Sequence, residues 1–471
     1  MQNQSQEDRD GLEWLRRYEE MQSEKKPVFI DPEGWDYIIF HFLQKEEPLK
    51  AKEACEAGLR TFPDSPELQL SYGHILFTCG EINRALEAVN KAEPFLPNDA
   101  DLILLKCTLQ NHLGKPQESI AYLQHCLEGQ PDQPEKVFYI LGSTLSELDL
   151  LPDAIIAFSK ALEIEPAFQE CLEELAVCLE EEDRIEEVIP YYRQALDKNP
   201  FDAEMWMAFA VMLNQAEEFE EAIDAVDYCL ALDEKKHIAW FHRANIFMNL
   251  KRFPEAAEDY EKAIKLYDRQ SEYFVGLGAA LEIQQKPDQA IHWFRKSVKV
   301  NPQQPDGYFG IGSCLLQLEK YAESLHFFGK AIQLDEANPE YWMCKGVAEN
   351  NLGNVISAEE AFCKVYELDP EHVDLWLDWS NLYFDQGEIE KAISMLDEAI
   401  ALMPDEAVLY YRAAAYHFAS GLSKEALLYL ENGIVLDYDS HAVLYDFFED
   451  VKTQKFLYNL VQEIRKKGTK E

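Results

Sequence analysis

The chain has 471 residues, and the 47% of them that are hydrophobic suffice for a packed core. Its 88 acidic and 43 basic side chains give a formal net charge of -45, which repels nucleic-acid phosphates and anionic lipid heads, so we expect no direct nucleic-acid binding. The sequence contains no apolar run of roughly 18 residues and no cationic segment that leads into an apolar one, so we expect neither membrane insertion nor secretion.

The first predicted element is a helix over residues 5–25. Four apolar side chains recur there at near-helical spacing, namely Leu12, Leu15, Tyr18 and Met21. A single helix of this kind buries its apolar face only against a neighbour. We therefore expect residues 1–31 to form an N-terminal capping helix over the next element.

Between residues 32 and 440 the sequence repeats every 34 residues. A typical unit has a large residue at position 4, small residues at positions 8 and 20, a bulky apolar residue at position 24 and a proline at position 32. In the unit that begins at Pro339, these residues are Trp342, Gly346, Ala358, Phe362 and Pro370. Twelve units begin at residues 32, 66, 100, 135, 169, 203, 237, 271, 305, 339, 373 and 407, and one extra residue near 131–134 makes the third unit 35 residues long. Four units replace the closing proline, with Glu234, Asp268, Glu336 and Tyr438.

This pattern predicts two packed helices in each unit. Positions 4, 7, 8 and 11 share one face of a helix, and this face meets the second helix. Small residues at positions 8 and 20 let the two backbones approach, while large side chains at positions 4 and 24 fill the space beside them. Burial of each large side chain contributes roughly 1.5–3 kcal/mol. Because one hairpin cannot hide both of its faces, neighbouring hairpins must stack into a solenoid.

The last predicted element covers residues 441–471. Its apolar residues form two helical stripes, Leu444, Phe447 and Phe448 on the first and Leu457, Leu460, Val461 and Ile464 on the second. We expect a degenerate thirteenth hairpin that caps the end of the solenoid. A basic tail follows it, with Lys466, Lys467 and Lys470.

The repeated residues resemble those of the tetratricopeptide repeat (TPR) family, whose 34-residue helix-turn-helix unit carries the same signature. The resemblance covers residues 32–440. It implies an all-α fold, a right-handed α/α superhelix of twelve tandem units known as a TPR solenoid. It also implies a protein that binds other proteins.

Motifs for catalysis, metals or cofactors are missing from the sequence. Gly276-Leu-Gly278 and Gly310-Ile-Gly312 fall inside predicted first helices, where a packing role is favoured over a phosphate-binding loop. The acidic run over residues 180–187 lacks the spacing of a calcium loop and is interpreted as a solvated turn. We therefore expect no enzyme activity, no metal site and no cofactor. Ten cysteines are scattered singly, which favours a reducing, cytoplasmic location.

In the TPR family the first helices line a groove, and the resemblance implies that positions 2, 5, 9 and 12 point into it. Nine of the twelve units carry an acid at position 2, namely Glu33, Glu67, Asp101, Glu170, Glu204, Glu272, Asp306, Glu340 and Asp374. Two interpretations remain open and are compatible. The acids complement the helix dipole, and they also form a surface that attracts basic ligands.

The candidate groove residues are of two kinds. The fifth unit is the most acidic, with Glu170, Glu173, Glu180 and Glu181 at or beside groove positions. Other units offer apolar anchors and amides, namely Phe241, Asn245, Phe309, Met343, Asn381, Phe384 and Tyr411. The alternative for the apolar members is that they pack against a neighbouring turn.

Some TPR proteins hold a C-terminal carboxylate with a clamp of Lys, Asn and Arg, but this chain does not show one. Lys106, Arg243 and Lys345 stand at position 7 on the packing side, and Lys136 alone faces the groove. The leading hypothesis is a cytoplasmic scaffold or adaptor that binds a basic, or mixed basic and aromatic, segment of another protein in an acidic groove. The alternative is a self-associating structural protein, a homo-oligomer whose terminal helices stack end to end.

Overall fold

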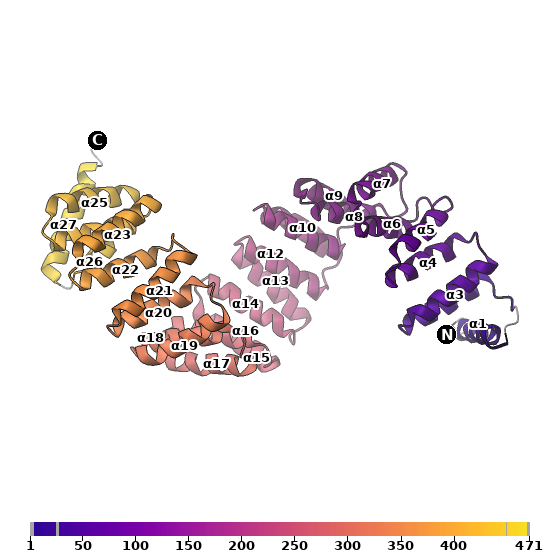
Figure 1. Cartoon of the computed structure of the whole chain (residues 1–471), viewed down its shortest axis with the longest axis horizontal. Helices are drawn as coiled ribbons and strands as arrows, with labels where there is room; N and C mark the ends of the chain where they lie inside the picture. The colour runs from indigo at the N-terminus through magenta and orange to yellow at the C-terminus, as the bar shows by residue number, and fades with distance from the viewer. Residues whose placement is uncertain (1–3, 25–27, 449, 469–471) are drawn as a thin grey trace. The chain divides into compact units, whose positions relative to one another are not determined.

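The computed structural model describes residues 4–24, 28–448 and 450–468. These residues form 27 α-helices and two short 3-10 helices, and no β-strand occurs among them. Figure 1 shows the helices following one another as antiparallel pairs. The prediction of an all-α fold built from tandem hairpins is confirmed. Lys470 of the predicted basic tail lies outside the described residues.

Each of the twelve units forms one helical hairpin, and every first helix is 13 residues long. The first six pairs are α2 (Pro32–Gln44) and α3 (Pro48–Thr61), α4 (Pro66–Thr78) and α5 (Ile82–Ala92), α6 (Ala100–His112) and α7 (Pro116–Glu128), α8 (Pro134–Ser146) and α9 (Leu151–Ile164), α10 (Gln169–Glu181) and α11 (Ile189–Lys198), α12 (Ala203–Gln215) and α13 (Phe219–Leu232). The 3-10 helix η1 (Ile185–Val188) leads into α11.

The next six pairs repeat the same arrangement. They are α14 (His237–Asn249) and α15 (Phe253–Leu266), α16 (Ser271–Ile283) and α17 (Pro287–Val300), α18 (Pro305–Gln317) and α19 (Tyr321–Leu334), α20 (Pro339–Asn351) and α21 (Val355–Leu368), α22 (Val373–Asp385) and α23 (Ile389–Leu402), α24 (Ala407–Ala419) and α25 (Ser423–Leu436). The segment after them contains η2 (Asp439–His441), α26 (Ala442–Asp446) and α27 (Val451–Gly468).

The turn inside each hairpin has a left-handed residue at position 15, which ends the first helix. Five units place glycine there, Gly80, Gly114, Gly353, Gly387 and Gly421, and seven place another residue, Glu46, Asp149, Asp183, Glu217, Lys251, Gln285 and Glu319. Their φ angles lie between 55 and 79 degrees. The step from Gly114 to Asp149 is the one that contains the extra residue, and Gln130, with φ 56 degrees, lies beside it. The turns therefore follow the register that the sequence predicts.

The glycines at position 8 allow the close helix contact that the sequence predicts. An ideal Cβ atom on Gly142, Gly278, Gly312 or Gly346 would lie 2.5 to 2.7 Å from the aromatic ring at position 24 of the same unit. These rings belong to Phe158, Phe294, Phe328 and Phe362. Carbon atoms pack best at about 3.5–4.0 Å, so only a residue without Cβ leaves room for the ring.

The glycines at position 6 serve contacts of the same kind. A Cβ on Gly276 would lie 2.5 Å from the ring of Tyr260, and a Cβ on Gly310 would lie 2.4 Å from the ring of Phe294. Both rings come from the preceding hairpin. The packing interpretation of the two Gly-x-Gly sequences is therefore correct.

The chain divides into two compact units, residues 1–234 and residues 235–471, called the first and second halves below. The sequence did not predict this division, because the 34-residue period continues through it. The boundary falls at Glu234, where a closing proline is missing. Three other hairpins also lack this proline without a boundary, so the loss of proline alone does not produce the division.

The first half begins with α1 (Gln4–Glu24), the predicted capping helix. Tyr18 is buried and meets the ring of Trp35 edge-on at 5.9 Å between centroids. Leu15 and Met21 pack against the same cluster. The prediction was wrong for Leu12, which is 66% exposed, because the apolar stripe of α1 turns toward the first hairpin through Trp14 instead.

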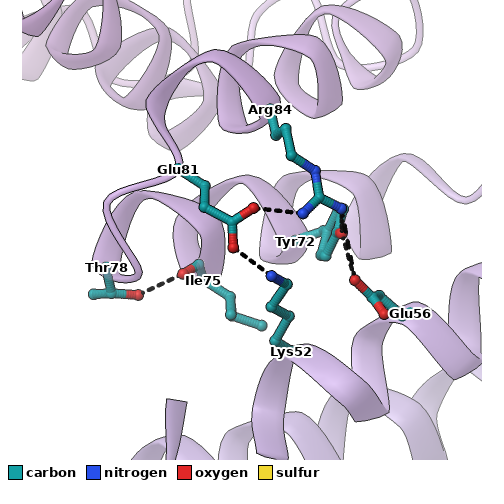
Figure 2. A network of polar contacts seen from close by, with 7 residues as sticks. All are labelled: Lys52, Glu56, Tyr72, Ile75, Thr78, Glu81 and Arg84. Carbon is teal, nitrogen blue, oxygen red and sulfur yellow. Dashed lines mark hydrogen bonds and ion pairs between the residues drawn. The ribbon is translucent and has the colours of Figure 1, made fainter. Parts of the chain in front are cut away.

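Polar side chains also tie neighbouring hairpins together, as Figure 2 shows for α3, α4 and α5. Glu81 accepts hydrogen bonds from Lys52 and Arg84. Arg84 donates to the Tyr72 hydroxyl at 2.7 Å, and Tyr72 donates to Glu56 at 2.8 Å. Burial and the bond to Glu56 raise the pKa of Tyr72 to about 12. This network links the first hairpin to the second beside their apolar contact.

The second half ends in the predicted cap. Leu444, Leu457 and Val461 are buried in one cluster with residues of α24 and α25. Phe447, Phe448, Leu460 and Ile464 are partly buried against it. The two predicted apolar stripes thus cover the last hairpin, with the first stripe on the short α26 and the residues after it.

Candidate functional site

Positions 2, 5, 9 and 12 of the first helices form a surface that we call the first-helix face. Neighbouring first helices contact one another from α4 to α10 in the first half and from α14 to α24 in the second half. Hydrogen bonds cross between them. Glu282 of α16 accepts from Ser313 of α18 at 2.6 Å and from Gln317 at 3.1 Å. Burial raises the pKa of Glu282, and the bond from Ser313 opposes this effect.

A hollow of about 930 Å³ opens on this face near the end of the second half, and we call it the C-terminal hollow. All four predicted groove positions of the eleventh unit line it, namely Asp374, Leu377, Asn381 and Phe384. The other lining residues are Asp378 and Asp385 of α22, Val408, Arg412 and Ala419 of α24, Val443 of α26, and Phe447, Phe448 and Asp450 after it. Because the wall comes from a first helix, its neighbour and the C-terminal cap, the hollow exists only at this end of the repeat series.

The C-terminal hollow is acidic, since it combines the carboxylates of Asp374, Asp378, Asp385 and Asp450 with the single guanidinium of Arg412. Burial raises the pKa of Asp378 to about 6, although the charge of Arg412 opposes this effect. The Nε atom of Arg412 is buried and has no hydrogen-bond partner among the described residues.

Aromatic rings form the apolar part of the wall. Phe384 stacks on Tyr416 with 4.5 Å between ring centroids and 13 degrees between planes. Phe447 meets Phe384 edge-on at 5.1 Å, and the guanidinium of Arg412 lies 5.4 Å from the Phe447 ring. The Tyr416 hydroxyl shares a hydrogen bond with Ser380 at 3.1 Å. These contacts hold the half-buried Phe384 ring in a fixed place.

The other apolar candidates of the second half pack against the next hairpin. Phe241 lies 4.8 Å from the Tyr273 ring, and Phe309 lies 4.9 Å from the Tyr341 ring, measured between centroids. Asn245 is engaged within its own hairpin, because its Oδ1 accepts a hydrogen bond from Tyr260 at 2.6 Å. Both phenylalanine rings are half-buried against a neighbouring hairpin. This is the alternative interpretation that the sequence left open.

Two candidate side chains are buried and are not accessible to a ligand. Met343 is 5% exposed and Tyr411 is 0% exposed. Tyr411 donates a hydrogen bond to the backbone oxygen of Asp437 at 2.8 Å, so the segment after α25 covers it. The structure contradicts their prediction as exposed groove anchors, because Met343 and Tyr411 are packed inside apolar clusters.

The acidic candidates Glu170, Glu173, Glu180 and Glu181 lie exposed on α10 in the first half. Glu173 accepts a hydrogen bond from Gln169 of the same helix, and Glu180 accepts one from Gln215 of α12 at 2.9 Å. They make an acidic surface of their own.

Sequence reasoning missed Asp378, Arg412 and Phe447 in the C-terminal hollow. A signal was present for the first, because Asp374, Asp378, Asn381 and Asp385 follow one another at helical spacings of four, three and four residues. No local signal marks Arg412 or Phe447, which reach the hollow through the packing of α24 and the cap.

The described part of the chain offers neither a metal cluster nor a membrane span. Within residues 4–24, 28–448 and 450–468, no group of three or more His, Cys, Asp or Glu side chains is arranged to hold a metal ion. None of the helices formed by these residues has both the length and the apolar character needed to span a lipid bilayer.

Family models described as tetratricopeptide repeat match residues 179–237, 237–269, 275–339 and 352–416. The search of curated proteins found no match. Similar solved structures include "Crystal structure of YrrB: a TPR protein with an unusual peptide-binding site", with 24% identity and a TM-score of 0.33 over 39% of this chain and 95% of that chain.

Two further structures are similar. "Crystal structure of APC/C hetero-tetramer Cut9-Hcn1" has 13% identity and a TM-score of 0.42 over 88% of this chain and 96% of that chain. "Crystal structure of MamA protein" has 18% identity and a TM-score of 0.33 over 36% of this chain and 94% of that chain. The matched family models and the tandem 34-residue hairpins together show that the chain carries tandem tetratricopeptide repeats.

Proposed function

We propose that this protein is a non-catalytic scaffold that binds a basic segment of another protein on its first-helix faces, and that the C-terminal hollow is the main binding site. Tetratricopeptide repeats generally mediate protein–protein interaction. The observation that carries the finer proposal is the C-terminal hollow itself, in which four carboxylates and one guanidinium surround an aromatic wall.

The chemistry of the hollow suits a lysine or arginine side chain. Asp374 and Asp385 are exposed and lie at either end of the same helical face, with Leu377 between them. The aliphatic stem of a basic side chain packs on Leu377 and Phe384 while its cationic head reaches a carboxylate. Asp385 already accepts a hydrogen bond from Asn381 at 3.0 Å, which orients its carboxylate along the wall.

The first half offers a second acidic face on α10, formed by Glu170, Glu173, Glu180 and Glu181. In the proposal these carboxylates speed the encounter with a basic partner, since exposed charges contribute more to the association rate than to the final affinity. All ten cysteines lie in the described residues and none forms a disulfide, which supports a reducing compartment such as the cytoplasm.

The test compares two variants that remove the same charge. The first carries Asp374→Asn with Asp385→Asn in the C-terminal hollow. The second, a control, carries Glu390→Gln with Glu398→Gln on the exposed side of α23. Partners are captured from the native organism with the full chain, identified by mass spectrometry and measured again with purified protein at several salt concentrations.

We expect the hollow variant to bind the basic partner about tenfold more weakly and with a flatter salt dependence, while the control binds as the wild type does. Two further variants test the rest of the first-helix faces. One carries Glu173→Lys with Glu180→Lys, and the other adds Phe309→Ala to these two substitutions. Unchanged binding in the hollow variant and in all the others would rule out the first-helix faces as the docking surface.

A further inference from the structure

A second hollow, of about 480 Å³, lies in the first half on the side of the second helices of the fifth and sixth hairpins. Its floor is aromatic and apolar, with Trp206 and Phe209 of α12 and Tyr228 of α13. Its rim is charged, with Arg193 and Asp197 of α11 and Glu221 and Asp224 of α13. We call it the outer hollow, because none of its residues stands at a position of the first-helix face.

Three other hairpins place a cation over the ring that corresponds to Trp206. In the fourth, seventh and ninth hairpins, a lysine at position 26 lies over the aromatic ring at position 4. The pairs are Lys160 over Phe138 at 5.6 Å, Lys262 over Trp240 at 4.2 Å and Lys330 over Tyr308 at 5.4 Å. In these three hairpins, a lysine of the second helix makes a cation–π contact with the aromatic ring of the first helix.

The sixth hairpin departs from this arrangement. Its residue at position 26 is Tyr228, which stacks on Trp206 with 4.6 Å between ring centroids and 20 degrees between planes. No Lys or Arg of the described residues makes a cation–π contact with either ring. An aromatic platform thus replaces the internal cation, and Tyr228 is 58% exposed.

The platform is held in place before any ligand arrives. The indole nitrogen of Trp206 donates a hydrogen bond to the backbone oxygen of Pro200 at 2.9 Å, which fixes the orientation of this ring. Trp206 in turn supports one face of Tyr228. The other face of Tyr228 is therefore presented without the entropy loss that a mobile ring would suffer on binding.

The charges at the rim are unbalanced. Arg193 is paired with Glu221, because its Nη2 lies 2.8 and 2.7 Å from the two carboxylate oxygens. Asp197 and Asp224 have no ion-pair partner within the described residues. The outer hollow thus combines an open aromatic face with two unpaired carboxylates.

We propose that the outer hollow binds an arginine side chain of a partner protein. A guanidinium is planar, so it stacks on the exposed face of Tyr228 while its N–H groups reach Asp197 and Asp224. The ammonium of lysine lacks this planar match, and a neutral isostere lacks the charge that the two carboxylates attract. This surface is separate from the first-helix faces, so the proposal stands or falls independently of the proposed function.

The experiment uses the full chain with 5-fluorotryptophan and follows the fluorine resonance of Trp206, which is assigned by its absence in Trp206→Phe. The ligands are N-acetyl-arginine amide, Nα-acetyl-lysine amide and the uncharged N-acetyl-citrulline amide. We expect the arginine compound to shift the Trp206 resonance saturably, the lysine compound to bind about fivefold more weakly, and the citrulline compound to have no effect.

Two variants decide whether the binding occurs in the outer hollow. Tyr228→Lys gives the sixth hairpin the arrangement that Lys262 and Trp240 show in the seventh, so we expect the lysine to lie over Trp206 as an internal cation. Asp224→Asn removes one carboxylate, and Glu220→Gln on the same helix is the matched control outside the hollow. We expect about tenfold weaker arginine binding in Tyr228→Lys and in Asp224→Asn, and wild-type binding in Glu220→Gln.

Several results would overturn the proposal. They are an unshifted Trp206 resonance at saturating arginine compound, equal shifts with the citrulline compound, and equal losses in Asp224→Asn and Glu220→Gln. Equal affinity for the lysine and arginine compounds would also reject arginine recognition in favour of a general cation site. Because Asp224→Asn changes no apolar contact, it keeps the test decisive even if Tyr228→Lys fails to fold.

Discussion

Replacement of Gly346 by alanine tests whether the aromatic ring at position 24 rests on the backbone of the first helix. The Cβ atom that this substitution adds would lie 2.5 Å from Cε1 and 2.8 Å from Cδ1 of Phe362, about 1 Å inside normal carbon contact. The Phe362 ring has little room to retreat, because it is fully buried in a cluster with Ala358, Val365 and Leu375. Overpacking of this kind costs about 1–3 kcal/mol.

The same substitution at Gly329 of α19 is the matched control. Gly329 is also helical, it is exposed, and a Cβ there would meet nothing within 4 Å. Alanine in an exposed helix is more stable than glycine by about 0.8–1 kcal/mol, so Gly329→Ala should raise the free energy of unfolding. Gly346→Ala gains the same helix propensity but loses more through overpacking. The difference between the two variants, about 1–3 kcal/mol, isolates the contact with Phe362.

The free energies of unfolding are measured by guanidinium denaturation followed by far-ultraviolet circular dichroism. Hydrogen exchange of the amides in α20 and α21 then localises the effect, because a solenoid can unfold in parts. In the background of Phe362→Leu, the Gly346→Ala substitution should cost less, since the side chain that the new Cβ meets no longer extends as far. If Gly346→Ala stabilises the protein as much as Gly329→Ala does, the close-packing argument is wrong.

Three further predictions concern backbone conformation and pH. Gly353→Ala meets no atom within 4 Å but forces a Cβ into a left-handed residue with φ 77 degrees, so denaturation should show a loss of about 1–2 kcal/mol, and a gain would contradict the turn geometry. Asp378 has a folded pKa of about 6, above its usual value of 3.8, so it makes the protein less stable as pH rises between these values. Asp378→Asn should flatten that part of the stability profile, and a basic peptide should bind the wild type more tightly above about pH 6 than below it, as isothermal titration can measure. His417 is buried, neither of its ring nitrogens has a hydrogen-bond partner among the described residues, and burial lowers its pKa. The wild type should therefore lose stability as the pH falls through about 6.5, the usual pKa of histidine. A phenylalanine in His417→Phe can stack on Tyr429 as the imidazole does, so this variant should be more stable and should not show the loss.

The sequence predicted the hairpins well because the residues that specify them lie close together in the chain. Gly346 and Phe362 lie on two helices, α20 and α21, that are joined by one short loop. The helical period of 3.6 residues shows which side chains of each helix share a face. The same local logic located the first helices and the extra residue near residues 131–134. It also gave a packing role to Gly276 and Gly310.

The candidate site was predicted only in part, because exposure on the first-helix face depends on what the neighbours contribute. Asn381 and Phe384 do line a hollow, but Tyr411, at position 5 of the next unit, is covered by the segment that follows α25. Arg412 and Phe447 enter the same hollow from another hairpin and from the cap. A repeat pattern shows which positions are equivalent, but it does not show which of them a neighbouring segment covers.

By itself, the sequence determined the helical hairpins, their register and the acidic character of the chain, since each follows from local periodicity or from composition. The tertiary structure decided which equivalent positions remain open, where the two halves divide, and that Tyr228 stacks on Trp206 where other hairpins place a lysine over the ring. The physical reason is that burial is set by contacts between hairpins, and these contacts involve residues far apart in the chain.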